Sequence, residues 1–168
     1  DSLDSCDDLG FYYGFKLRPG NTFSSQEAES EINRVFSKLK FREKKFYRAD
    51  SAFCNEEIIK ACLNTGAKFT ITAHDNMKWE SEAKQMTTWE KWRYTDEEIK
   101  KAQLKKLKLP EIEFGMFQYR PSWSENLRFN VVVKRTLLKE GEQSTLFAEQ
   151  GWKHCGVLTN WDMFLNTK

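Results

Sequence analysis

The sequence predicts an α/β protein in which helices cover the faces of a sheet. Residues 11–18, 45–50 and 69–73 are hydrophobic segments with the composition of β-strands. A segment with helical character lies in each interval between them, and this alternation of strand and helix is typical of an α/β sheet. A chain of 168 residues can form one hydrophobic core, or one core with an inserted subdomain.

The first helix is expected after the turn at residues 19–21. Ser24 and Glu27 have the spacing of a capping box, in which two side chains bond free N–H groups of the first helical turn. The apolar residues that follow fall on one face of a helix: Ala28, Ile32, Val35, Phe36 and Leu39. We expect this face to pack on the sheet.

The second helix is expected to begin after Asn55, a favourable N-cap residue, and to run to about Thr65. Gly66 suits the left-handed conformation that commonly ends a helix. The strand at 45–50 therefore ends at Asp50, directly before the turn that leads into this helix.

Beyond His74 the chain is polar, with scattered tryptophans, and then returns to strands. Thr95 and Glu98 predict a capping box for a lysine-rich helix from 96 to about 107. Segments 111–119 and 127–138 predict a hairpin around residues 121–124, with Val131, Val132 and Val133 buried on both faces. A last strand is expected at 152–159.

The net charge of +2 is too small to indicate nucleic-acid binding by itself, so any contact with DNA must come from local clusters of basic residues. Two such clusters fit either a solvated surface or a contact with phosphates. The first precedes Asp50 and comprises Lys38, Lys40, Arg42, Lys44, Lys45 and Arg48. The second comprises Lys100, Lys101, Lys105, Lys106 and Lys108.

Cysteine and histidine give no sign of a metal site. The four cysteines lack close C-x-x-C pairs and the density of a secreted disulfide scaffold, so we expect reduced and mostly buried thiols. His74 and His154 are isolated in sequence and are interpreted as structural. No apolar run approaches the length that a bilayer span needs, so no membrane partner is expected.

Three motifs occur in order along the first half of the chain: YGFKLRPGNT at residues 13–22, YRADSAF at 47–53 and GAKFTI at 66–71. Together they resemble the DDE transposases of bacterial insertion sequences, in the branch with ribonuclease H-like catalytic domains. Residues 119–123, 127–133 and 157–160 match further motifs of these relatives.

The resemblance implies a ribonuclease H-like mixed sheet with flanking helices and a β-rich insertion. Residues 1–73 would form part of the catalytic core, 74–160 the insertion, and 161–168 the return toward the core. It also implies a bacterial cytoplasmic protein that acts on double-stranded DNA at transposon ends, as a homodimer in the full-length form.

The chemistry implied by the resemblance is phosphodiester hydrolysis and strand transfer with two divalent ions. Oxygen ligands suit Mg²⁺ or Mn²⁺. The family uses two aspartates and one glutamate, and Asp50 matches the second aspartate. None of Asp1, Asp4, Asp7 and Asp8 lies in a motif that matches the first, and the glutamate motif is not found before Lys168. We therefore expect the chain to be a piece of a longer transposase, with weak metal binding and no transposition by itself.

Alternative interpretations remain for each candidate. Asp50 also suits a cap of the turn before the Asn55 helix. Arg48, Lys44 and Lys45 are predicted DNA contacts, and Trp123, at the expected hairpin tip, is predicted to stack on a DNA base or else to be packed in the core. The whole chain is then a catalytic-core piece of a transposase, a non-catalytic DNA-binding or assembly module, or a metal-dependent nuclease that does not transpose.

Overall fold

The computed structural model describes residues 2–6, 12–39, 44–74, 77–138 and 151–162. Its first half contains β1 (Ser2–Cys6), β2 (Tyr12–Leu17), α1 (Ala28–Lys38), β3 (Phe46–Ala49), the short 3₁₀-helix η1 (Ser51–Phe53), α2 (Glu56–Asn64) and β4 (Lys68–Thr72). Its second half contains α3 (Trp79–Gln85), β5 (Glu90–Lys91), α4 (Asp96–Leu104), β6 (Ile112–Tyr119), β7 (Phe129–Leu137) and β8 (Trp152–Thr159).

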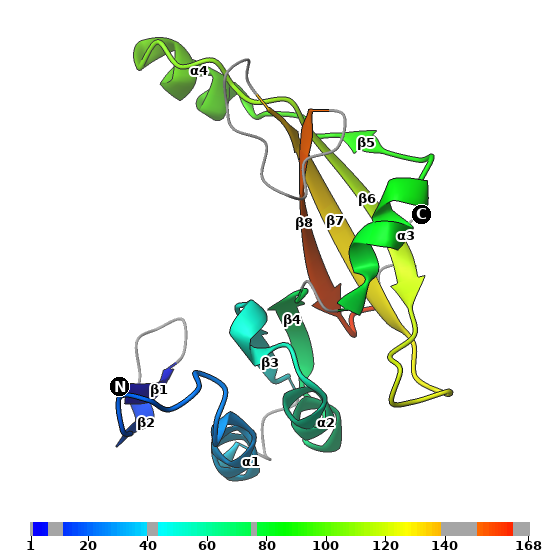
Figure 1. Ribbon diagram of the computed structural model, residues 1–168. Helices are drawn as coiled ribbons and strands as arrows, with labels where there is room; N and C mark the ends of the chain where they lie inside the picture. The colour runs from blue at the N-terminus through cyan, green and yellow to red at the C-terminus, as the bar shows by residue number, and fades with distance from the viewer. Residues whose placement is uncertain (1, 7–11, 40–43, 75–76, 139–150, 163–168) are drawn as a thin grey trace.

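The described strands form two sheets. β1 and β2 pair as an antiparallel hairpin, and the other strands form a six-stranded sheet in the order β3-β4-β8-β7-β6-β5. β3 and β4 are parallel, whereas the remaining pairs are antiparallel, so the sheet is mixed. This architecture confirms the α/β class and is compatible with the ribonuclease H-like fold expected above (Figure 1).

The core lies on one face of the large sheet. Leu158 of β8 pairs with Ile71 of β4 on one side and with Val131 of β7 on the other, and all three residues are fully buried. Helices α2 and α3 contribute Ile58, Ile59, Cys62, Trp79 and Ala83 to the same core. Val132 is only partly buried because its side chain points to the opposite face, which corrects the expectation that all three valines are buried.

The local signals at three helix ends are confirmed. The Asn55 side chain accepts a hydrogen bond from the Ile58 N–H at 3.0 Å, and Gly66 has the left-handed conformation with φ +69°. Thr95 and Glu98 form both bonds of the capping box at the start of α4.

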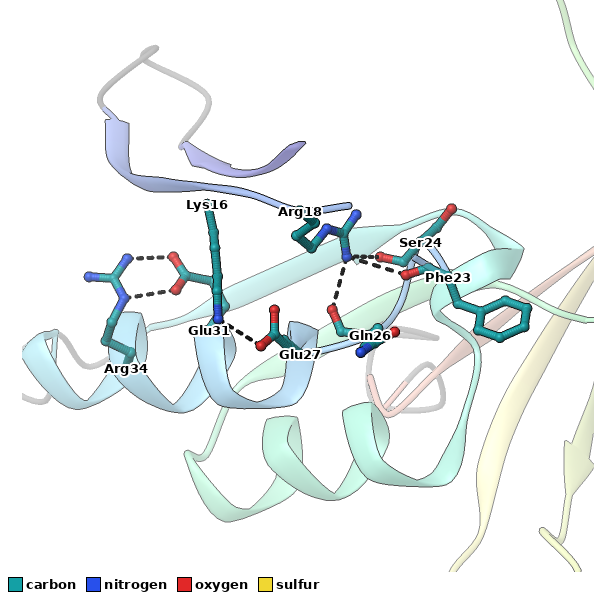
Figure 2. A network of polar contacts seen from close by, with 8 residues as sticks. All are labelled: Lys16, Arg18, Phe23, Ser24, Gln26, Glu27, Glu31 and Arg34. Carbon is teal, nitrogen blue, oxygen red and sulfur yellow. Dashed lines mark hydrogen bonds and ion pairs between the residues drawn. The ribbon is translucent and has the colours of Figure 1, made fainter. Parts of the chain in front are cut away.

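The capping box expected at the start of α1 is wrong. The helix begins at Ala28, and its N-cap is Glu27 in a left-handed conformation. Figure 2 shows the cause: the Arg18 guanidinium, which is buried, donates from Nη1 to the carbonyls of Phe23, Ser24 and Gln26 at 2.9–3.3 Å. The Glu27 carboxylate accepts a bond from the Lys16 ammonium at 2.6 Å instead of bonding the backbone. Residues 23–27 are therefore held as turns.

Three elements were not expected from the sequence: β1, α3 and β5. Helix α3 lies against β6 and β8. Gly156 of β8 has no side chain to block the helix, and Gly115 of β6 leaves room for Met86 and Trp89, which follow the helix. The Trp79 ring packs over Gly156, with its nearest atom 2.9 Å from the position that a Cβ atom would take. Within the described residues, no helix is both long enough and apolar enough to span a bilayer.

Candidate active site

Asp50 directly follows β3 and begins the turn into η1. Its backbone is extended, and its Oδ1 accepts a hydrogen bond from the Ala52 N–H at 3.0 Å. Its carbonyl oxygen accepts a second bond, from the Phe53 N–H at 3.2 Å. Asp50 therefore caps the turn, and the same hydrogen bond fixes the orientation of its carboxylate.

The capping bond does not remove this carboxylate from solvent. Asp50 is exposed, and within the described residues it forms no ion pair and uses only one carboxylate oxygen for a hydrogen bond. Its second oxygen, Oδ2, is therefore free to bind a ligand that approaches from solvent. Beneath it, burial raises the pKa of the Tyr47 phenol, with smaller contributions from Cys62 and Asp50, so this phenol is neutral at pH 7.

Arg48 lies on the same side of the chain as Asp50. Along β3, Phe46 and Arg48 are exposed whereas Tyr47 and Ala49 are half-buried, as expected for a strand with one face on the core. Residues two positions apart in an extended chain point to the same side, so Arg48 and Asp50 share the outer face. The Phe46 ring on this face stacks on Trp161 with a centroid separation of 5.2 Å.

The two predicted lysine contacts differ in their surroundings. Lys44 is exposed at the entrance to β3. The Lys45 ammonium donates at 2.6 Å to the carbonyl of Thr65, at the end of α2. An ammonium has three donors, so Lys45 can hold this helix end and still have two donors for another acceptor.

Trp123 is half-buried and does not project freely from the hairpin tip. Its ring packs at 6.3 Å from the Phe129 ring, and the Lys60 ammonium stands 5.3 Å from its centroid. Trp123 also lines a cavity of about 270 Å³ between the start of α2, Met77 and the β6–β7 turn. Its ring is therefore partly packed in the core and partly open to this cavity.

The sequence did not identify the other polar groups at this cavity. Glu56 lines it and forms an ion pair with Lys60 at 2.5 Å, four residues along α2. The thiol of Cys54, also in the lining, is 3.3 Å from the Met77 sulfur. The Glu56–Lys60 spacing is a sequence signal for a helical ion pair, but nothing in the sequence places it beside Trp123.

Asp50 is not part of a larger cluster of metal-ligating side chains in the described part of the chain. There, no group of three or more His, Cys, Asp and Glu side chains is close enough to hold a metal ion. Asp4 lies in β1, while Asp1, Asp7 and Asp8 lie outside the described residues. Cys54, Cys62 and Cys155 are free thiols, of which Cys62 is buried, Cys54 half-buried and Cys155 exposed.

A family model described as transposase DDE domain group 1 matches residues 11–150. The matched region includes Asp50, the basic residues beside it and Trp123. The chain belongs to this family. Membership makes it part of an enzyme family of DNA transposition, whose DDE domains generally use divalent metals. No curated protein matches the chain at a significant level.

The residues described here do not complete the metal site that such a domain uses. A carboxylate oxygen is a suitable ligand for Mg²⁺ or Mn²⁺, and the free oxygen of Asp50 qualifies. One carboxylate cannot hold two ions, however, and the described residues supply no cluster around it. Asp50 is therefore at most one member of a ligand set.

Proposed function

We propose that this DDE domain serves DNA cleavage and strand transfer at transposon ends, and that Asp50 is one of its metal-binding catalytic carboxylates. The observation that carries this proposal is the position of Asp50, exposed at the end of β3 with one oxygen fixed by the turn and the other free. The remaining ligands for Mg²⁺ or Mn²⁺ would come from residues outside the described part of the chain.

The surroundings of Asp50 support a DNA substrate. Arg48 is exposed on the same side of the chain, and Lys44 is exposed at the start of the strand. We propose that these two residues, with the spare donors of Lys45, bind phosphates that flank the scissile bond. Guanidinium and ammonium groups are the usual partners of DNA phosphates.

Trp123 is proposed to contact a base in the cavity that it lines. A cavity of about 270 Å³ with an aromatic wall and a nearby ammonium suits a nucleobase stacked on the ring. If so, Trp123→Phe in the complete transposase retains most of the binding to transposon-end DNA, whereas Trp123→Ala weakens it by about 1–3 kcal/mol. Unchanged binding by Trp123→Ala would remove Trp123 from the site.

The rest of the proposal concerns the whole protein. We infer a bacterial cytoplasmic transposase that acts as a homodimer, of which this chain is a part that binds metal weakly and does not transpose alone. Residues 1–73, 74–160 and 161–168 are proposed as core, insertion and return to the core.

Asp50→Asn tests the catalytic role without disturbing the turn. An asparagine side chain can still accept the Ala52 N–H bond, but it has lost the negative charge that a metal ligand needs. In a metal-dependent cleavage and strand-joining assay with the complete transposase, we expect a loss of more than about 100-fold, because changes to outer-shell groups alone cost up to that much. The midpoint of urea unfolding should stay unchanged.

Glu57→Gln is the matched control, because it neutralises an exposed carboxylate in the first turn of α2. It should leave cleavage unchanged. Near-normal cleavage by Asp50→Asn would reduce Asp50 to a turn cap. A transposase that binds its DNA ends but never cleaves them would favour the non-catalytic module, and cleavage without strand joining would favour the nuclease.

A further inference from the structure

Helix α4 sits in the connection between β5 and β6, an arm that comprises residues 93–111. Two bonds close its base: the Trp92 N–H donates to the carbonyl of Ile112 at 2.8 Å, and the Tyr94 hydroxyl donates to the carbonyl of Pro110 at 2.6 Å. Figure 1 shows α4 projecting beyond the ends of β6, β7 and β8, away from α1 and α2. The arm is therefore a defined projection from one end of the sheet.

Positive charge is concentrated in the second part of this arm. Residues 99–108 contain five lysines and no acidic residue, although the whole chain has a net charge of only +2. All five are exposed: Lys100, Lys101, Lys105, Lys106 and Lys108. Within the described residues none of them forms an ion pair, although Lys101 acts electrostatically on Glu98. The acidic residues Asp96, Glu97 and Glu98 are confined to the first helical turn.

The lysines are held on a fixed helix end. The Leu107 N–H donates to the carbonyl of Ala102 at 2.9 Å, and the Lys106 N–H donates to that of Gln103 at 3.1 Å. With Lys106 in the left-handed conformation at φ +50°, these bonds form a Schellman motif. A charged surface with fixed geometry loses less conformational entropy on binding than a loose loop does.

Helix stability alone does not account for this composition. Cations stabilise a helix when they lie in its last turn, but α4 ends at Leu104 and three of the lysines lie beyond it. Leu104 and Leu107, between the lysines, are 85% and 63% exposed, so the arm carries apolar side chains that the described part of the chain leaves uncovered. A partner with dense negative charge and apolar edges fits this mixture, and duplex DNA has both.

We propose that the α4 arm binds the phosphate backbone of duplex DNA, chiefly through Lys105 and Lys108, at a distance from Asp50. This rests on the proposed function insofar as DNA is the substrate. The register of the sheet gives this distance. Ala49, the residue before Asp50, pairs with Ile71 of β4, which pairs with Leu158 of β8, and Leu158 in turn pairs with Val131 of β7. The arm joins the sheet near the other end of β7. These two positions on β7 are about six residues apart, which is about 20 Å along a strand. Since one base pair spans about 3.4 Å of the DNA axis, the arm contacts phosphates at least about six base pairs from the reacting bond.

The test is equilibrium binding of the complete transposase to a transposon-end duplex, in buffer without divalent ions, as a function of salt concentration. Lys105→Gln/Lys108→Gln should lower the magnitude of the slope of log K against log salt by about 1.8, because each lost phosphate contact contributes about 0.9. The matched control is Lys134→Gln/Lys153→Gln, which removes two exposed lysines from β7 and β8. It should retain the wild-type slope.

The outcomes separate this proposal from the proposed function. If the arm variant, the control and the wild type have equal slopes, the role of the arm is overturned. The proposed function still holds in that case if the wild type cleaves DNA and Asp50→Asn does not. A lower slope for the arm variant alone supports the arm even if the enzyme never cleaves DNA. A wild-type protein that binds no duplex at about 50 mM salt overturns both.

Discussion

Asp50 caps a turn and also presents a carboxylate for the catalytic role proposed above. The bond from the Ala52 N–H holds Oδ1, so the carboxylate is restricted to a narrow range of orientations before any ligand arrives. A ligand set with restricted side chains loses less freedom on binding metal, which is the usual advantage of a preorganised site. The structural role of Asp50 is therefore compatible with the proposed catalytic one.

Gly156 is packed against a rigid aromatic ring. A Cβ atom there would stand 2.9–3.1 Å from three atoms of the Trp79 ring, which is closer than ordinary contact. We expect Gly156→Ala to destabilise the fold by about 1–3 kcal/mol, the usual cost of overpacking. The midpoint of urea unfolding measures this effect.

Gly20→Ala is the control for Gly156→Ala. A Cβ atom at Gly20 meets nothing within 4 Å, and Gly20 is not among the residues with positive φ. The variant should change the unfolding free energy by less than about 1 kcal/mol, in the stabilising direction if at all. Equal effects of the two variants would show that the Trp79 ring moves away from β8 without cost.

At the scale of elements, β6, β7 and β8 are joined by one arginine. The Arg135 guanidinium lies 3.9 Å from the Trp89 ring and 4.5 Å from the Trp152 ring, and its Nε donates to Glu113 Oε2 at 2.7 Å. Glu113 is buried, with 7% exposure, so it depends on this partner. The stack holds the segment before β5 against the sheet.

Arg135→Met should destabilise the protein by about 3–5 kcal/mol, because it leaves a buried carboxylate without its cation. The double variant Arg135→Met/Glu113→Gln should recover part of that loss, since no buried charge remains. Urea unfolding of the wild type, both single variants and the double variant gives the coupling energy. If the losses simply add, the ion pair has no role beyond its separate contacts.

Prediction of elements from the sequence succeeded where the decisive contacts were local. The capping box at Thr95 formed because its partner, Glu98, has no competing cation bonded to it in the described residues. The similar pattern at Ser24 failed because Arg18, directly after β2, holds the Ser24 carbonyl in a turn, and Lys16 of β2 binds the Glu27 carboxylate that the cap needed. Helix α3 was missed because its position depends on contact with β6 and with Gly156 of β8, which are distant in the sequence.

In the candidate site, too, local sequence predicted one residue's position but not the other residue's surroundings. The position of Asp50 after a strand and before a capped helix follows from residues 45–58 alone, and the structure has these elements. The environment of Trp123 did not follow, because Lys60 and part of the cavity lining, including Glu56 and Ile59, come from the first half of the chain. The assignment of Asp50, Arg48, Lys44, Lys45 and Trp123 to a site stays a prediction.

At the scale of the whole molecule, the two halves of the chain share one sheet through β4 and β8. Asn160 extends this pairing beyond the last strand residues: its Oδ1 accepts from the Phe69 N–H at 2.8 Å, and its Nδ2 donates to the Ala67 carbonyl at 3.0 Å. The Thr159 hydroxyl donates to the Phe69 carbonyl at 2.6 Å. The junction between the halves therefore depends on side-chain bonds to the backbone of β4 and the residue before it.

These bonds predict that the wild type unfolds in one cooperative transition and that Asn160→Ala separates it into two. The variant leaves a backbone N–H and a carbonyl beside buried Phe69 without partners, at a cost of about 1–3 kcal/mol for each group. All six tryptophans follow residue 73, so tryptophan fluorescence reports chiefly on the second half, whereas helical circular dichroism also includes α1 and α2. Coincident curves for the wild type and separated curves for Asn160→Ala are expected.

Asn130→Ala, which removes a buried amide within the second half, should lower stability and keep the curves coincident. If the Asn160→Ala curves also coincide, the β4–β8 strand pairing alone is enough to couple the halves.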